Sequence, residues 1–196
     1  MPRLLAIGSA MIGSGRNIFL VGPMGSGKTT VGRHLARAAA LEFVDSDQEI
    51  EARTGVDIPY IFEREGEARF RAREEQTLAD LVQREAIVLA TGGGAVLNAD
   101  TRRRLAAHGC VIYLHATVAQ QIERTAHCRN RPLLRGVDRE ATLARLLEQR
   151  DPLYREVADL IVDIRRCSAH ALALQILRQI AQAEADQMAY PCAAQQ

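Results

Sequence analysis

The stretch NIFLVGPMGSGKT at residues 17–29 joins a continuous apolar run to a glycine-rich loop. A short, wholly apolar run is typical of a strand that is buried on both faces of a sheet. After the loop, Val31, Leu35 and Ala38 recur at the spacing of one helix face. The stretch therefore predicts a strand, a tight loop and a helix in immediate succession.

The loop GPMGSGKT at residues 22–29 matches the pattern GxxxxGK[ST], which binds nucleotide phosphates. Its glycines allow backbone N–H groups to approach phosphate oxygens, and the positive end of the following helix points at the same anion. Lys28 would contact the β and γ phosphates, and the Thr29 hydroxyl would reach one Mg²⁺ ion for each ATP. The candidate ATP-binding residues of this loop are Gly25, Ser26, Gly27, Lys28, Thr29 and Thr30.

Further short apolar runs alternate with amphipathic segments along the rest of the chain. They lie at residues 43–44, 86–90, 110–114 and 160–164. This alternation predicts an α/β fold, in which a parallel sheet is covered by helices on both faces. Because no repeat or linker interrupts the pattern, we expect one domain over residues 16–185. We expect a disordered extension at 1–15 and a tail at 186–196.

Several helices carry sequence signals of their position. A buried helix face running toward residue 84 is indicated by Phe70, Thr77, Leu78 and Leu81. Asn98 or Asp100 can cap the start of another helix, and Gly109 would end it. Residues 127–137 are polar and rich in arginine, which predicts a loop.

Composition excludes several classes of protein. The 25 basic and 24 acidic residues almost balance in this chain of 196 residues, which argues against a nucleic-acid-coating protein. No apolar run approaches the roughly 20 residues that cross a membrane. The four cysteines show no CxxC or zinc-ligand spacing, so we expect reduced thiols and a cytoplasmic protein. Only one of the basic residues, Lys28, is a lysine.

Polar clusters follow three of the predicted strands, at residues 22–30, 45–47 and 91–94. In a parallel sheet these clusters meet beyond the carboxyl ends of the strands, where ligands bind. Alternation along an extended segment would point the carboxylates of Asp45 and Asp47 the same way, although a polar strand end is an ordinary feature.

Two further patterns can belong to an acceptor site. Arg71 and Glu74, three residues apart, would share a helix face, as many surface ion pairs do. The glycines of TGGG at residues 91–94 carry an entropic cost unless a ligand or another backbone approaches closely.

Taken in order, these motifs resemble those of the shikimate kinase family over about residues 16–180. The resemblance rests on NIFLVGPMGSGKTTVGR, FVDSDQEIE, FEREGEARFRAREE, LATGGGAV, RPLL and RDPLY. Within the family, the chain is similar to the bacterial single-domain members. It implies a three-layer P-loop kinase fold like that of nucleoside monophosphate kinases, with a five-stranded parallel sheet in the order 2-3-1-4-5. It implies transfer of the γ-phosphoryl group of ATP to the 3-hydroxyl of shikimate, a step toward chorismate and aromatic amino acids.

The resemblance also implies roles for individual residues. Asp47 matches the aspartate that binds the shikimate hydroxyls and accepts a proton, and Asp45 matches a neighbour that organises Mg²⁺. A shikimate-binding subdomain would span about residues 45–75, and a lid about 124–137. The remaining shikimate-binding residues implied are Arg71, Arg150, Gly92, Gly93, Gly94, Phe62, Phe70 and Glu74. The residues implied near ATP are Lys28, Arg124 and Arg131, with a backbone contact at Cys167.

Other functions remain open from sequence alone. A kinase of the same shape could phosphorylate gluconate or a nucleotide, although the arginines at 71 and 150 with the glycines at 91–94 favour shikimate. A regulatory module that has lost catalysis should lack Lys28 or Asp47, and both are present. An ATPase acting on nucleic acid would need a basic stripe and extra length. The fold analogy implies a monomer, and the balanced charge and the lack of a long apolar run predict no nucleic-acid or membrane partner.

Overall fold

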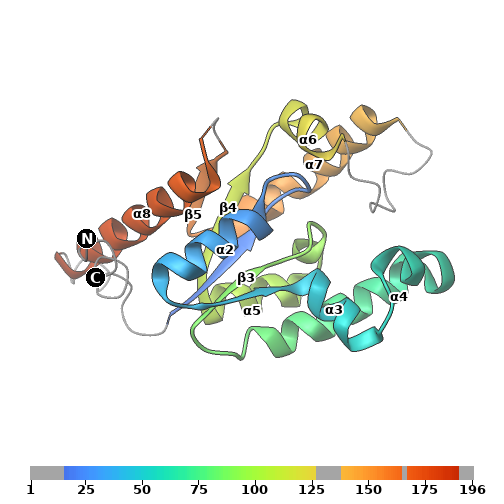
Figure 1. Ribbon diagram of the computed structural model, residues 1–196, viewed down its shortest axis with the longest axis horizontal. Coiled ribbons are helices and arrows are strands. Elements are labelled where there is room, and N and C mark those ends of the chain that lie inside the picture. Colours follow the sequence, from blue (N-terminus) through green and yellow to red (C-terminus); the bar gives the residue numbers. More distant parts are fainter. Residues whose placement is uncertain (1–15, 127–137, 165–166, 190–196) are drawn as a thin grey trace, which may run out of the picture.

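The computed structural model describes residues 16–126, 138–164 and 167–189. Strands and helices alternate along the chain (Figure 1). The strands are β1 (Asn17–Val21), β2 (Glu42–Asp45), β3 (Ile87–Ala90), β4 (Gly109–His115) and β5 (Leu160–Asp163). The helices are α2 (Lys28–Ala39), α3 (Ser46–Thr54), α4 (Ile58–Leu81), the 3₁₀ turn η1 (Ala95–Leu97), α5 (Ala99–His108), α6 (Val118–Thr125), α7 (Arg139–Val157) and α8 (Ala169–Ala189).

The five strands form one parallel sheet in the order β2-β3-β1-β4-β5. This arrangement confirms the predicted α/β class and strand order. Within the described residues, none of the helices is long and apolar enough to cross a membrane. The central strand β1 lies between β3 and β4, so the loop that follows it emerges at the middle of the carboxyl edge.

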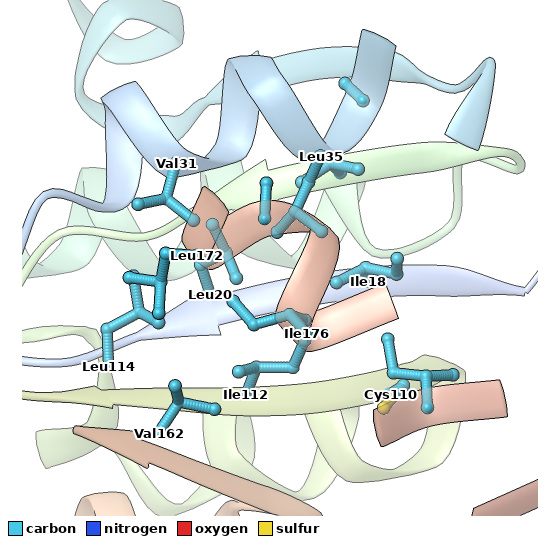
Figure 2. Packing of buried hydrophobic residues seen from close by; sticks show 14 of the residues in the cluster. Ile18, Leu20, Val31, Leu35, Cys110, Ile112, Leu114, Val162, Leu172 and Ile176 are labelled. Carbon is cyan, nitrogen blue, oxygen red and sulfur yellow. The ribbon is translucent and has the colours of Figure 1, made fainter. Parts of the chain in front are cut away.

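Alternating residues of β1 point into two separate cores, which explains why residues 18–21 of this strand are all apolar. Ile18 and Leu20 pack with side chains from α2 and α8, as Figure 2 shows. Phe19 and Val21 face the opposite side of the sheet and pack with residues of α4, α5 and α7. Helices therefore cover both faces, and burial of these two cores holds the loop after β1 in place.

A third, smaller apolar cluster joins α3 to the first part of α4. It is formed by Ile50, Ile61 and Phe70, with Phe62 packed against it. Helix α4 is interrupted at Gly66, whose φ of 80° is a left-handed conformation that a side chain would strain. Figure 1 shows α3 and α4 at the end of the molecule opposite α8.

The predicted ends of α5 are partly confirmed. Asn98 is the N-cap, and its side chain accepts a hydrogen bond from the backbone N–H of Thr101. The helix ends before Gly109 as predicted, but Gly109 is extended, with φ of −172°, and is the first residue of β4. A Cβ atom at Gly109 would lie 2.7 Å from the Asn17 carbonyl oxygen. This glycine is required by close packing and not by a left-handed helix end.

Replacing Gly109 with alanine should lower the free energy of unfolding by about 1–3 kcal/mol, because the added methyl group overlaps the β1 backbone. Urea denaturation followed by circular dichroism measures this change. Ala107→Ser, an exposed change two residues earlier near the end of α5, is the control and should leave the midpoint unchanged. Equal midpoints for Gly109→Ala and the unmodified chain would contradict the packing argument.

Candidate active site

The loop between β1 and α2 is held at the middle of the sheet edge by the strand and helix that flank it. Gly27 is the N-cap of α2 and has φ of 88°, a left-handed conformation that favours glycine. Lys28, the first residue of the helix, donates hydrogen bonds from Nζ to the carbonyl oxygens of Gly22 (2.7 Å) and Pro23 (2.9 Å). The ammonium group therefore lies over the loop, where the motif requires a cation.

An acidic cluster lies next to this loop, at the end of β2. The Thr29 hydroxyl donates to Asp45 Oδ2 at 2.7 Å, which ties the start of α2 to β2. Asp45 Oδ1 accepts the Asp47 backbone N–H at 3.0 Å, so Asp45 is also the N-cap of α3. The prediction that alternation along an extended segment aligns the two carboxylates is wrong, because Asp47 lies in the first turn of α3. Both still line the same cavity, because the helix begins between them.

The glycine turn after β3 lies against this acidic cluster. The Thr91 hydroxyl donates to the Leu20 carbonyl at 3.1 Å, and the Gly92 N–H donates to Ser46 Oγ at 2.9 Å. A Cβ atom at Gly92 would lie 2.9 Å from Asp47 Oδ1. A Cβ atom at Gly94 would overlap the Arg71 guanidinium. The missing side chains therefore allow a carboxylate and a guanidinium to reach the turn.

Arg71 and Glu74 form an ion pair on α4, as their spacing predicts. Arg71 Nη1 donates to Glu74 Oε2 at 2.6 Å, and Arg71 Nη2 donates to Glu67 Oε1 at 3.0 Å. Burial raises the pKa of Glu74, and the charge of Arg71 opposes that effect. Burial tends to lower the pKa of Arg71, but the two carboxylates raise it above its ordinary value, so this guanidinium stays charged. Arg71 is therefore a fixed cation beside the glycine turn.

Arg150 reaches the same turn from α7. Its side chain is buried, with 5% of its surface exposed, and Nη1 donates to the Gly93 carbonyl at 3.2 Å. Among the described residues, nothing accepts a hydrogen bond from Arg150 Nε or donates one to Glu74 Oε1. Phe62 and Phe70 pack together with ring centroids 4.7 Å apart, and the Arg71 guanidinium carbon lies 5.1 Å from the centre of the Phe70 ring.

A cavity of about 440 Å³ extends along the loop after β1. The predicted residues that line it are Gly25, Gly27, Lys28, Thr29, Thr30, Asp45, Asp47, Gly93, Arg124 and Cys167. Ser26 is fully buried beneath the loop and does not line the cavity. Arg71, Glu74 and Gly94 instead line a neighbouring cavity of about 390 Å³.

The cavity has cationic and apolar walls in addition to the loop. Arg124, on α6, places Nη1 3.5 Å from where a Cβ atom of Gly27 would lie. Cys167 lines the far side together with the first residues of α8. Arg131 and most of the predicted lid at 124–137 lie outside the described residues.

Two residues that hydrogen-bond the backbone of the glycine turn were not predicted. Ser46 lies between the two aspartates and is fully buried, and its hydroxyl accepts the Gly92 N–H. Tyr154 is also fully buried, and its hydroxyl donates to the Gly93 carbonyl at 2.5 Å. The spacing of Arg150 and Tyr154, four residues apart on one helix face, was a signal that could have identified the tyrosine.

Comparison with known proteins agrees with this geometry. The sequence model of the family described as "SKI: Shikimate kinase" matches residues 24–181. A shikimate kinase from Pseudoalteromonas atlantica is 55% identical over 167 residues, which cover 85% of this chain and 98% of the relative. One from Nitrosococcus oceani is 58% identical over 166 residues, covering 85% of this chain and 87% of the relative.

The solved structures give the same result. A shikimate kinase from Acinetobacter baumannii, in complex with shikimate, superposes with a TM-score of 0.86 at 51% identity. The match covers 87% of this chain and 96% of the other. The predicted resemblance and P-loop kinase fold are confirmed, and the chain belongs to the shikimate kinase family.

Proposed function

We propose that this chain is a shikimate kinase that transfers the γ-phosphoryl group of ATP to the 3-hydroxyl of shikimate, giving shikimate 3-phosphate and ADP. The observation that carries this proposal is the convergence of Arg71 and Arg150 on the glycine turn beside the phosphate-binding loop. Two guanidinium groups at one turn suit a carboxylate, because each can donate paired hydrogen bonds to it. In this family the product leads to chorismate and the aromatic amino acids.

The nucleotide end of the site would bind the ATP phosphates. Backbone N–H groups of the loop and the positive end of α2 would face the phosphate oxygens. Lys28 and Arg124 line the cavity and would place positive charge around the transferring group. This charge would stabilise the transition state, because phosphoryl transfer depends on positioning and on neutralising negative charge.

Thr29 and Asp45 fit a Mg²⁺ ion, because a hydroxyl and a carboxylate oxygen 2.7 Å apart are the hard ligands that this cation prefers. No group of three or more histidine, cysteine or acidic side chains that could hold a metal occurs in the described part of the chain. The other ligands would therefore be phosphate oxygens and water. When bound, the ion would neutralise charge on the β and γ phosphates.

The acceptor end would hold shikimate between the two arginines and Asp47. Its carboxylate would face Arg71 and Arg150, and its hydroxyls would face Asp47 and the backbone of the glycine turn. Asp47 would accept the proton of the attacking hydroxyl as the phosphoryl group arrives. Glu74 would hold Arg71 in place through their 2.6 Å ion pair.

An acceptor comparison tests this function. The chain should release ADP in a coupled assay when shikimate is present, and much more slowly with gluconate or nucleoside monophosphates. A Lys28→Ala variant gives the background rate. Turnover with a different acceptor alone would replace the proposed substrate, and ATP binding without any turnover would favour a regulatory module.

We also propose that the protein acts as a cytoplasmic monomer with its acceptor subdomain at about residues 45–75. The small core shared by α3 and α4 supports that subdomain. Of the cysteines in the described part of the chain, Cys110 and Cys167 are both free thiols, which suits a reducing compartment. Sedimentation velocity measures the oligomeric state.

A further inference from the structure

The carbonyl oxygen of Gly93 accepts two hydrogen bonds from α7. Tyr154 Oη donates one at 2.5 Å, and Arg150 Nη1 donates the other at 3.2 Å. Both side chains are buried, and they lie one helical turn apart on the same face. A carbonyl oxygen has two lone pairs, so these two donors satisfy it fully.

The ring of Tyr154 packs against a second tyrosine. The ring of Tyr113, on β4, packs against it with centroids 4.9 Å apart. The Tyr113 hydroxyl donates to Asp151 Oδ1 at 2.7 Å, and Asp151 Oδ2 accepts from Arg155 Nε at 2.6 Å. Burial raises the pKa of Tyr154 above its ordinary value, so its hydroxyl remains a hydrogen-bond donor at working pH.

The two donors to Gly93 differ in capacity, and this difference has a consequence for Arg150. Tyr154 has one hydroxyl hydrogen and gives it to the carbonyl, whereas Arg150 bonds the carbonyl through Nη1 alone. The guanidinium has five N–H donors in a planar fork. Because Tyr154 satisfies Gly93, Arg150 can direct its remaining donors toward a carboxylate beside the turn.

We propose that Tyr154 is a positioning residue for substrate binding, which acts by holding the Gly93 carbonyl so that Arg150 is available to the shikimate carboxylate. This proposal rests on the proposed function, because it needs shikimate to bind at Arg150. Without the hydroxyl, the buried carbonyl would depend on Arg150 alone, and the guanidinium would be drawn toward Gly93. The carboxylate would then compete with Gly93 for the same donors.

Tyr154→Phe removes only the hydroxyl and tests the proposal directly. We expect the KM and the dissociation constant for shikimate to rise by about 5- to 20-fold, the effect of losing one buried hydrogen bond. The KM for ATP should stay unchanged, and kcat should stay within about twofold, because Tyr154 touches neither the nucleotide cavity nor the reacting atoms.

Tyr113→Phe is the matched control, because it also removes a buried hydroxyl, from the tyrosine stacked on Tyr154. It loses its bond to Asp151, but the donors to the Gly93 carbonyl are Arg150 and Tyr154, and both remain. We expect it to lower the thermal midpoint without raising the KM for shikimate. Circular dichroism of both variants shows that the proteins compared are folded.

A double-mutant cycle distinguishes action through Arg150 from a general loosening of the fold. If Tyr154 acts through Arg150, adding Tyr154→Phe to an Arg150→Ala variant should weaken shikimate binding little further. An equal loss in both backgrounds, or unchanged affinity in Tyr154→Phe alone, would overturn the proposal. Failure of the unmodified chain to phosphorylate shikimate would instead overturn the proposed function.

Discussion

Replacing Asp47 with alanine should reduce kcat for shikimate phosphorylation by about 10²- to 10⁴-fold, the contribution of a positioned general base. Asp47 lies in the first turn of α3 and lines the cavity, with Oδ1 facing the glycine turn. The change removes the proposed proton acceptor but leaves the phosphate-binding loop intact. ATP should therefore still bind with nearly normal affinity. A coupled ADP-release assay measures kcat, and titration calorimetry measures ATP binding.

Glu49→Gln is a matched control for the Asp47 variant. Glu49 is also an acidic residue in the first turn of α3, but it pairs with Arg53 at 2.9 Å and does not line the cavity. Its loss should leave kcat almost unchanged. Near-normal turnover by Asp47→Ala would remove Asp47 from the proposed mechanism.

Replacing Arg150 with alanine should weaken shikimate binding by about 2–5 kcal/mol, the cost of truncating one partner of a buried charge pair. The guanidinium is buried beside the glycine turn, so no water could replace its fixed donors at equal strength. ATP affinity should stay unchanged, because Arg150 does not line the nucleotide cavity. Titration calorimetry with each ligand separates the two effects.

Arg71→Ala should act in the same direction but should also destabilise the fold, because it leaves Glu74 buried without its ion-pair partner. Arg145→Ala, an exposed change on the same helix as Arg150, is the control and should not alter shikimate binding. Unchanged shikimate affinity in both the Arg150 and Arg71 variants would contradict the assignment of a carboxylate site.

The parts of the fold that could be predicted are those coded by local patterns. The apolar run at 17–21 and the helical spacing after it predict β1 and α2, and both are present. The loop between them is equally local, because its glycines, Lys28 and Thr29 adjoin in sequence. Even the cap at Asn98 follows from a short-range hydrogen bond.

The relation between Asp45 and Asp47 could not be read from alternation. The interpretation assumed that the strand continues, whereas Asp45 caps a new helix at that point. The sequence pattern of a strand end differs little from that of a helix start over three polar residues. The hydrogen bond from Thr29 to Asp45 comes from another element, so local periodicity cannot reveal it. Local periodicity therefore identified the right residues, whereas the helix cap at Asp45 and the hydrogen bond from Thr29 decided their geometry.

The sequence by itself determined the individual strands and helices, the phosphate-binding loop and the chemical groups that follow each strand, because these depend on neighbours along the chain. The single lysine of the chain, Lys28, also lies in that loop, where a compact ammonium on a flexible stem suits phosphate oxygens. Only the tertiary structure decided that Arg71 from α4 and Arg150 from α7 meet at one glycine turn, and that Ser46 and Tyr154 hold it. The physical reason is that these residues lie far apart in sequence, so only the packing of the helices on the sheet brings them together.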